Sequence, residues 1–403
     1  MRNRIILHID VNNAFLSWMA IDRLNKGEKI DIRNRYAVIG GDEESRRGVV
    51  LAKSNLCKSR GVVTGESLYN ARRKCPYLEV YKGNFEVYRK YSNLMYEYLT
   101  QYTNIIERYS IDECFLDYTY SFNLFGDPVK IAYKIKDDIK TKFGFTVNVG
   151  IGNNKLQSKM ASDFSKPDKV HTLFDNEIKD KMWPLPIEDL FMLGKSSSSK
   201  LREMGIKTIG EIANSDINFL IKNFKSHGKL MWEFANGIDD SEVSFIEHDP
   251  KSISNSTVLP FNYSKRDELL KVLRILAMDV GKKLRSNGMY AKNVGIWIKY
   301  SNFVRVSKQM NLENVIHTDN DIYNYSVILF DKLWNKEDTI RGLCVSVGNL
   351  RNENIEQLSL FEMGNTKKSN KNDEKLQKVL DDIRNKYGSD MIMYADMLEK
   401  KKD

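Results

Sequence analysis

The chain has 403 residues, of which 41% are hydrophobic, and its formal net charge is +9. This length exceeds what one hydrophobic core usually supports, so we expect a globular protein with two or more domains. No apolar run is long enough to span a bilayer and no signal peptide is evident, which argues against a membrane protein and favours a cytoplasmic location.

The positive charge and the scattered cysteines narrow the classes of partner and cofactor. A basic surface attracts polyanions such as nucleic acid, although surplus lysine is also common on ordinary soluble proteins. The four cysteines form no C-x-x-C pair, and the five histidines form no H-x-x-x-H pattern. We therefore expect buried, reduced thiols rather than zinc or disulfide bonds.

The first part of the chain mixes strand and helix patterns. Arg4–Asp10 alternates as a strand that ends on a carboxylate, and Glu107–Asp117 is extended with a turn around Ser110–Glu113. Isoleucines at 131, 135 and 139 recur every four residues and predict a helix, whereas the β-branched Thr146–Ile151 predicts a strand. These elements indicate an α+β domain.

The next part changes pattern twice. In Pro184–Ser215, apolar residues are interrupted by glycines, which predicts short helices joined by tight turns. Ser241–Lys251 is polar and predicts a linker. A second α+β unit then follows, with a helical stripe over Leu269–Leu284 and alternating strands at Val294–Tyr300 and Leu343–Val347.

After Leu350 the chain becomes polar. Residues Gly364–Asn372 have the composition of a flexible linker, and Glu374–Tyr387 predicts a short final helix. We find no internal repeat in the sequence.

Three acidic residues are candidates for a metal site. Asp10 closes the first strand, and Asp112 and Glu113 are adjacent on an otherwise apolar extended segment. Burying neighbouring carboxylates is costly without a counter-charge, and Mg²⁺ prefers such oxygen ligands. Two such ions could clamp a phosphoryl transfer. The alternative is an acidic hairpin tip that is exposed to solvent.

Three motifs resemble those of Y-family, lesion-bypass DNA polymerases, and the similarity is greatest to the UmuC-like and DNA polymerase IV-like branch of bacteria. The first lies in Ile5–Phe15 and the second in Ser110–Asp117. The third comprises Val149–Leu156, Lys159–Asp163 and Lys166-Pro167. They occur in the family's order and spacing, and the resemblance covers roughly residues 1–361.

The resemblance implies an α+β fold shaped like a right hand, with palm, fingers, a helix-hairpin-helix thumb and a separate α+β little-finger domain. The implied boundaries are 1–22 and 83–173 for the palm, 23–82 for the fingers, 174–240 for the thumb, 241–251 for a linker, 252–352 for the little finger, and 353–403 for a flexible tail with a clamp-binding peptide.

The resemblance also implies an activity: a DNA-directed DNA polymerase that adds dNTPs to a primer 3′ end by two-metal nucleotidyl transfer. Low-fidelity translesion synthesis in DNA repair and the SOS response is the implied cellular role. Its catalytic residues are Asp10, Asp112 and Glu113, which with the Val11 carbonyl ligate two Mg²⁺ ions. The resemblance also implies that Mn²⁺ can substitute for Mg²⁺.

Three further residues match the family's nucleotide-binding positions. Phe15 stands at the family's steric-gate position, where an aromatic ring sits against C2′ of the incoming sugar. The alternative is a core aromatic. Lys58 and Lys166 match positions that meet the triphosphate, which needs cationic neutralisation. Many relatives carry a tyrosine and an arginine where this chain has Asn55 and Lys58, and lysine lacks the bidentate fork of arginine.

The thumb hairpin and the tail also carry family features. Met192 stands at the first glycine of the family's usual G-x-G hairpin. The resemblance still implies backbone N–H contacts to DNA phosphate from Gly194 onward. The tail resembles the Q-L-x-L-F peptide by which bacterial polymerases bind the sliding clamp (β subunit). The alternative is that the tail residues pack back on the second α+β domain. The implied clamp contacts are Gln357, Leu358, Leu360 and Phe361.

The expected partners are primer-template DNA, dNTP and the clamp, and no membrane is expected. Some UmuC-like systems also need an accessory subunit, so that partner stays open.

Two other functions remain alternatives at this point. A two-metal nuclease could use the same acids on a basic protein. A non-catalytic DNA- and clamp-binding factor would not need the acids at all. Extension or shortening of a primer separates these possibilities.

Overall fold

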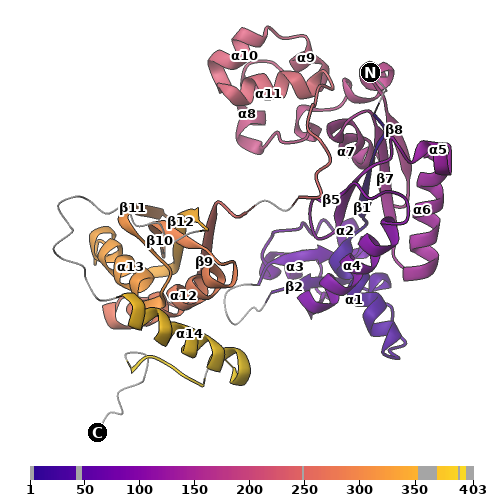
Figure 1. Ribbon diagram of the computed structural model, residues 1–403. Coiled ribbons are helices and arrows are strands. Elements are labelled where there is room, and N and C mark those ends of the chain that lie inside the picture. The colour runs from indigo at the N-terminus through magenta and orange to yellow at the C-terminus, as the bar shows by residue number, and fades with distance from the viewer. Residues whose placement is uncertain (1–3, 42–47, 247–248, 353–369, 389–390, 396–403) are drawn as a thin grey trace. The chain divides into compact units, whose positions relative to one another are not determined.

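The computed structural model describes residues 4–41, 48–246, 249–352, 370–388 and 391–395 (Figure 1). The described residues divide into two compact units, 4–41 with 48–246 and 249 onward. Among the described residues, no helix combines the length and apolar character needed to cross a membrane. All four cysteines are free and buried, as the sequence predicts.

The first unit is built around a five-stranded sheet in the order β5-β6-β1-β7-β8. The strand β1 is central and pairs antiparallel with both β6 and β7, so both of its edges are hydrogen-bonded. The predicted first strand, the extended hairpin and the strand near residue 150 are confirmed. The strand bounds are β1 (Ile6–Val11), β5 (Ile106–Arg108), β6 (Glu113–Asp117), β7 (Val147–Gly152) and β8 (Val170–Leu173).

Helices cover both faces of this sheet. One face packs in a large apolar core with helices α1 (Ala14–Asn25), α4 (Phe85–Leu99) and α6 (Pro128–Phe143), and the short α5 (Phe122–Phe125) precedes α6. The opposite face carries α7 (Lys155–Asp163). Figure 1 shows α6 and α7 on the two sides of β7.

Local sequence explains where α6 begins and ends. Asp127 caps the helix by accepting hydrogen bonds from the N–H groups of Val129 and Lys130, at 2.8 and 3.0 Å. Pro128 occupies the first turn, where its missing N–H is no loss, and Gly144 ends the helix with a φ of 80°. The predicted helix over isoleucines 131–139 is therefore confirmed.

Helix α7 lies unusually close to β7 because two glycines face it. A Cβ at Gly150 would lie 1.9 Å from the Ser158 carbonyl oxygen, and one at Gly152 would lie 2.5 Å from the Gln157 side chain. Only glycine permits this approach of helix and strand. The close packing brings side chains of α7 directly over the polar face of the sheet.

A smaller three-stranded sheet, in the order β3-β2-β4, follows α1 in the chain. It has its own small apolar core, which includes Val38, Cys57 and Leu68. The elements of this region are the 3-10 turn η1 (Ile32–Asn34), the strands β2 (Ala37–Gly40), β3 (Val50–Lys53) and β4 (Glu79–Lys82), and the helices α2 (Asn55–Ser59) and α3 (Leu68–Lys74).

After β8 the first unit becomes helical, as the glycine-interrupted pattern predicts. These short elements share an apolar core with one side of α7. They are η2 (Asp175–Glu177), η3 (Ile178–Met182), η4 (Ile187–Asp189), α8 (Lys195–Glu203), α9 (Ile209–Ala213), α10 (Ile217–Phe224) and α11 (Ser226–Ala235).

The second unit has a four-stranded antiparallel sheet in the order β11-β10-β12-β9, with two helices in its core. The predicted helix and both predicted strands are present, whereas the sequence patterns missed the two outer strands β9 and β11. The bounds are β9 (Ser252–Tyr263), α12 (Arg266–Ser286), β10 (Tyr290–Tyr300), β11 (Arg305–Ile316), α13 (Asp319–Leu333) and β12 (Ile340–Arg351).

The predicted final helix is confirmed as α14 (Asn370–Tyr387), and it belongs to the second unit. The buried carboxylate of Asp319 lies 2.9 Å from Arg384 on α14 and 3.0 Å from Arg285 on α12. Arg285 also binds Asp381 of α14. This part of the predicted tail is therefore a packed helix that is held by buried ion pairs.

Candidate active site

The pairing of β1 with β6 brings the predicted acids together. Asp10 and Glu113 are directly opposite each other in the antiparallel register, and the Val11 N–H donates to the Asp112 carbonyl oxygen at 3.1 Å. Side chains at opposed positions lie on the same face of the sheet, and like charges there repel. Asp10, Val11, Asp112 and Glu113 all line one cavity.

Two lysines form ion pairs with two of the three acids, Asp10 and Glu113. The Lys159 ammonium on α7 lies 2.9 Å from Glu113 and 3.5 Å from Asp10, and its side chain is only 10% exposed. The Lys166 ammonium lies 2.7 Å from the Asp10 carboxylate. Both lysines also contact Asp163, at 3.4 and 2.9 Å. Carboxylates and ammonium groups therefore form one ionic network at the end of β1.

The pKa values of these groups follow from burial and from the network. Burial raises the pKa of Asp112, and the charges of Asp10 and Glu113 add to the effect, although the Ser110 hydroxyl donates to it at 2.7 Å. Burial alone would raise the pKa of Glu113, but the His8 ring and the Lys159 ammonium hold it well below its usual range. Burial opposes the Lys159 charge, yet the acids raise its pKa. At neutral pH, the Lys159–Glu113 pair is therefore ionised.

His8 is fully buried beneath the cluster. Its Nδ1 pairs with the Ser162 hydroxyl at 2.8 Å, and its ring lies 4.5 Å from that of Phe115. Its Nε2 faces the Glu113 carboxylate at 3.8 Å and makes no shorter hydrogen bond among the described residues. Burial lowers the pKa of His8, although the neighbouring Glu113 acts in the opposite direction.

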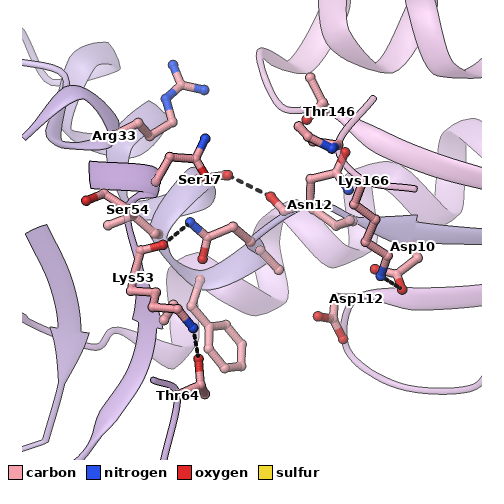
Figure 2. Close-up of a pocket in the computed structure, with 18 of the residues that line it drawn as sticks. Asp10, Asn12, Ser17, Arg33, Lys53, Ser54, Thr64, Asp112, Thr146 and Lys166 are labelled. Atoms are coloured by element: carbon pink, nitrogen blue, oxygen red, sulfur yellow. Dashed lines mark hydrogen bonds and ion pairs between the residues drawn. The ribbon is translucent and has the colours of Figure 1, made fainter. Parts of the chain in front are cut away.

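The cavity in front of the acids has a volume of about 560 Å³. Figure 2 shows Asp10, Asp112 and Lys166 on one side of it, and Lys53, Thr64 and Arg33 on the other. A space of this size with a few placed polar groups suits a small-molecule substrate.

Phe15, from the first turn of α1, forms part of the cavity wall. Its ring stacks on Tyr88 with 4.5 Å between centroids, and it packs at the edge of the main core. The two interpretations of Phe15, a core aromatic and a wall of the nucleotide pocket, are thus compatible in one position.

Two lysines from the smaller sheet region also line the cavity. Lys58 is on α2, and Lys53 ends β3, where its ammonium donates to the Thr64 hydroxyl at 3.0 Å. Partial burial lowers the pKa of Lys53, and the nearby charge of Lys58 adds to this. Neither lysine is paired with a carboxylate among the described residues. Asn55 lies beside them in the lining.

The donor atoms of the cluster suit a hard divalent cation. Three carboxylates and the backbone of Val11 border one cavity, and oxygen ligands of this kind are those Mg²⁺ prefers. Within the part of the chain that the structure describes, no three acidic, histidine or cysteine side chains already converge as a metal cluster. Because lysines hold two of the carboxylates in this arrangement, a cation would have to take over their charge.

The hairpin before α8 contains a left-handed residue at Met192. Met192 adopts a φ of 67°, the left-handed region that favours glycine, and is exposed. Gly194 caps α8 with a φ of −80°. A methionine therefore occupies a backbone conformation that glycine adopts more easily.

The predicted clamp-binding peptide lies outside the described residues, so the structure does not test it. Its residues are Gln357, Leu358, Leu360 and Phe361.

Reasoning from the sequence alone missed two of the site's cations. Lys159 falls within the third motif, but nothing in that motif shows that its side chain points at the acids. Its spacing of four residues from Asp163, on one face of a helix, was the available signal. Lys53 ends a strand just before the Ser54 helix cap, a position that carries no chemical signature.

The fold is that of a Y-family DNA polymerase. A solved Y-family polymerase chimera of Dbh and Dpo4 matches with a TM-score of 0.75 over 87% of this chain and 100% of that chain, at 20% identity. A Dbh ternary complex with partially disordered substrates matches with a TM-score of 0.57 over 85% of this chain and 98% of that chain, at 22% identity. The predicted right-hand α+β fold is confirmed.

Sequence comparison places the chain within that class. The impB/mucB/samB family matches residues 9–163, and its C-terminal domain matches residues 250–360. DNA polymerase IV of Clostridium acetobutylicum is 47% identical over 398 residues, which is 99% of each chain. DNA polymerase IV of Acetivibrio thermocellus is 37% identical over 89% of each chain, and DNA polymerase IV 2 of Bacillus subtilis is 34% identical over 98% of this chain and 95% of that one. The chain therefore belongs to the impB/mucB/samB family of Y-family polymerases and is a DNA-directed DNA polymerase.

Proposed function

We propose that this polymerase adds dNTPs to a primer 3′ end with two Mg²⁺ ions, or Mn²⁺ in their place, held by Asp10, Asp112, Glu113 and the Val11 carbonyl. The observation that carries the proposal is the register that sets Asp10 opposite Glu113 at the wall of a nucleotide-sized cavity. When bound, such ions activate the attacking hydroxyl and neutralise charge on the leaving phosphates.

The residues around the acids have separate tasks in this proposal. Phe15 limits the space beside C2′ of the sugar because its ring is backed by Tyr88 and cannot retreat. Lys58 and Lys166 neutralise the triphosphate from two sides of the cavity. Lys166 remains cationic because Asp10 raises its pKa despite burial, so the same group can pair with a carboxylate or a phosphate.

Primer-template DNA is the proposed macromolecular substrate. We assign residues 1–22 and 83–173 to the palm, 23–82 to the fingers, 174–240 to the thumb and 252–352 to the little finger. The left-handed backbone at Met192 supports a thumb hairpin that offers N–H groups to DNA phosphate. Residues 241–251 form the linker and 353–403 the tail in this assignment.

The proposed cellular role is low-fidelity translesion synthesis during DNA repair and the SOS response, in the cytoplasm. The DNA polymerase IV relatives support this role. The peptide at residues 357–361 would tether the enzyme to the sliding clamp and raise its concentration at the primer end. An accessory subunit remains an open partner.

A primer-extension assay with Asp112→Asn tests the proposed mechanism. The carboxylate acts on charge that develops in the transition state, so extension should fall roughly 100-fold or more while DNA affinity is retained. Asp180→Asn, which alters an exposed acid of η3, is the matched control and should extend normally. Normal extension by folded Asp112→Asn protein would remove Asp112 from the mechanism.

The cellular proposal needs a second assay. The enzyme should extend a primer past an abasic site, and added clamp should increase the length of the products. A protein with both Leu360→Ala and Phe361→Ala should lose that stimulation, because apolar anchors carry most of such a peptide's binding energy. Equal stimulation of the double variant would show that another surface binds the clamp.

A further inference from the structure

We infer that two buried amides, Asn12 and Asn148, are positioning residues that fix Lys166 relative to Asp10. The inference rests on the proposed contact between Lys166 and the triphosphate. Lys166 lies between α7 and β8 in a segment with neither helical nor strand structure. Its backbone therefore lacks the regular hydrogen bonds of a helix or strand, and its polar groups and its position depend on other partners.

Asn148 supplies the first part of that restraint. Its side chain is fully buried on β7, on the face that α7 covers. Its Nδ2 donates to the carbonyl oxygens of Ser162 at 2.9 Å and Ser165 at 2.6 Å. Its Oδ1 accepts from the N–H of Lys169 at 3.3 Å. One side chain thus holds the chain on both sides of Lys166.

Asn12 supplies the second part. Its Oδ1 accepts from the N–H of Asp168 at 2.9 Å, and its Nδ2 donates to the Asn148 oxygen at 3.1 Å. The Asp168 carboxylate is held in turn by Lys136 and Lys140, at 3.0 and 2.8 Å. The segment is therefore restrained at residues 162, 165, 168 and 169.

Asn12 also connects this segment to β1, the strand that carries Asp10. Asn12 follows Asp10 by two residues, and its backbone N–H donates to the Thr146 carbonyl at 2.9 Å. Its own carbonyl accepts from the Ser17 hydroxyl at 2.9 Å, as Figure 2 shows. Hydrogen bonds thus hold both the backbone N–H and the carbonyl of Asn12. Its side chain in turn holds the loop that carries Lys166 at a set position relative to β1.

Amide side chains suit this task because each offers both donors and acceptors. Asn148 uses both capacities in a buried setting, where an unmade hydrogen bond is expensive, so its geometry is tightly determined. The side chain of lysine is flexible, so the position of its ammonium group depends on how firmly its backbone is held. The two asparagines thereby limit the positions at which the ammonium can meet a phosphate.

A double-mutant cycle distinguishes positioning from a general structural role. Single-turnover extension over a range of dNTP concentrations would give the apparent Kd and the maximal rate for the parent, Asn148→Ser, Lys166→Ala and the double variant. Asn148→Ser should raise the apparent Kd for dNTP roughly 10- to 100-fold, as expected when a binding group is misplaced. In the Lys166→Ala background, Asn148→Ser should have little further effect, because the group it positions is gone.

Asn154→Ala is the matched control. Asn154 is also buried, and it bonds to Gln157 and Gly237 rather than to the Lys166 segment. Its loss should lower thermal stability and leave the apparent Kd for dNTP unchanged. If Asn148→Ser does not fold, Asn12→Ala enters the same cycle, since it frees the Asp168 N–H and leaves Asn148 in place.

The outcomes separate the inference from its premise. An unchanged apparent Kd in Lys166→Ala would overturn the proposed contact of Lys166 with the triphosphate, and the positioning role with it. The other outcome is that Lys166→Ala raises the apparent Kd and that the fold-changes of the two single variants multiply in the double variant. That result would overturn the positioning role alone.

Discussion

Lys159→Met should make the stability of the first unit depend on a divalent cation. The Lys159 ammonium lies 2.9 Å from Glu113 and 3.5 Å from Asp10 in a largely buried site. Removing one partner of a buried ion pair costs about 3–5 kcal/mol in the free energy of unfolding. Because Lys166 still neutralises Asp10 at 2.7 Å, we expect a loss near the lower end, about 3 kcal/mol.

Amide hydrogen exchange of β1 and β6 measures this loss locally, in the presence of EDTA and then of Mg²⁺. Methionine retains most of the apolar stem, so the charge is the main change. Mg²⁺ should restore most of the lost protection in Lys159→Met, because the unpaired carboxylates then bind the ion. The parent protein should respond less to Mg²⁺, since its lysine competes for the same oxygens.

Lys155→Met provides the control on the same helix. Lys155 lies one turn earlier and pairs with Glu107 at 2.7 Å, outside the cavity lining. Its replacement should also reduce protection, but Mg²⁺ should not restore it. Equal protection of Lys159→Met and the parent in EDTA would refute the reasoning, as would a Mg²⁺ response of the same size in Lys155→Met.

Three further predictions follow from the cavity and from the packing of α7. Phe15→Ala should increase ribonucleotide use relative to dNTP in steady-state kinetics, and unchanged discrimination would leave the ring a packing role only. Lys53→Ala and Lys58→Ala should each weaken dNTP use more than DNA binding, and loss of DNA affinity alone would assign the lysine to the duplex. Gly150→Ala should prevent folding, because its Cβ would lie 1.9 Å from a backbone oxygen, whereas Gly194→Ala meets nothing within 4 Å and should retain the melting temperature.

The sequence alone determined much of the first unit and the identity of the acids. Alternation in the first strand and in the hairpin is a local property, so β1 and β6 could be predicted from residue order. The adjacent Asp112 and Glu113 could be singled out because paired acids on an apolar segment are chemically unusual. In the second unit, the strands with clear alternation were found, whereas β9 and β11 were not, because both are largely exposed outer strands with weak apolar patterns.

Tertiary structure alone decided which groups meet at the site. The register that places Asp10 opposite Glu113 joins residues more than 100 positions apart, and no local pattern encodes it. Lys159 and Lys53 are 2 of 63 basic residues. Only the packing of α7 turns Lys159 toward the acids, and only the end of β3 places Lys53 in the cavity lining. Asn12 and Asn148 become partners for the same reason. The sequence sets the chemistry of each side chain. Which side chains meet depends on strand register and helix packing between distant segments, and these are properties of the folded chain as a whole.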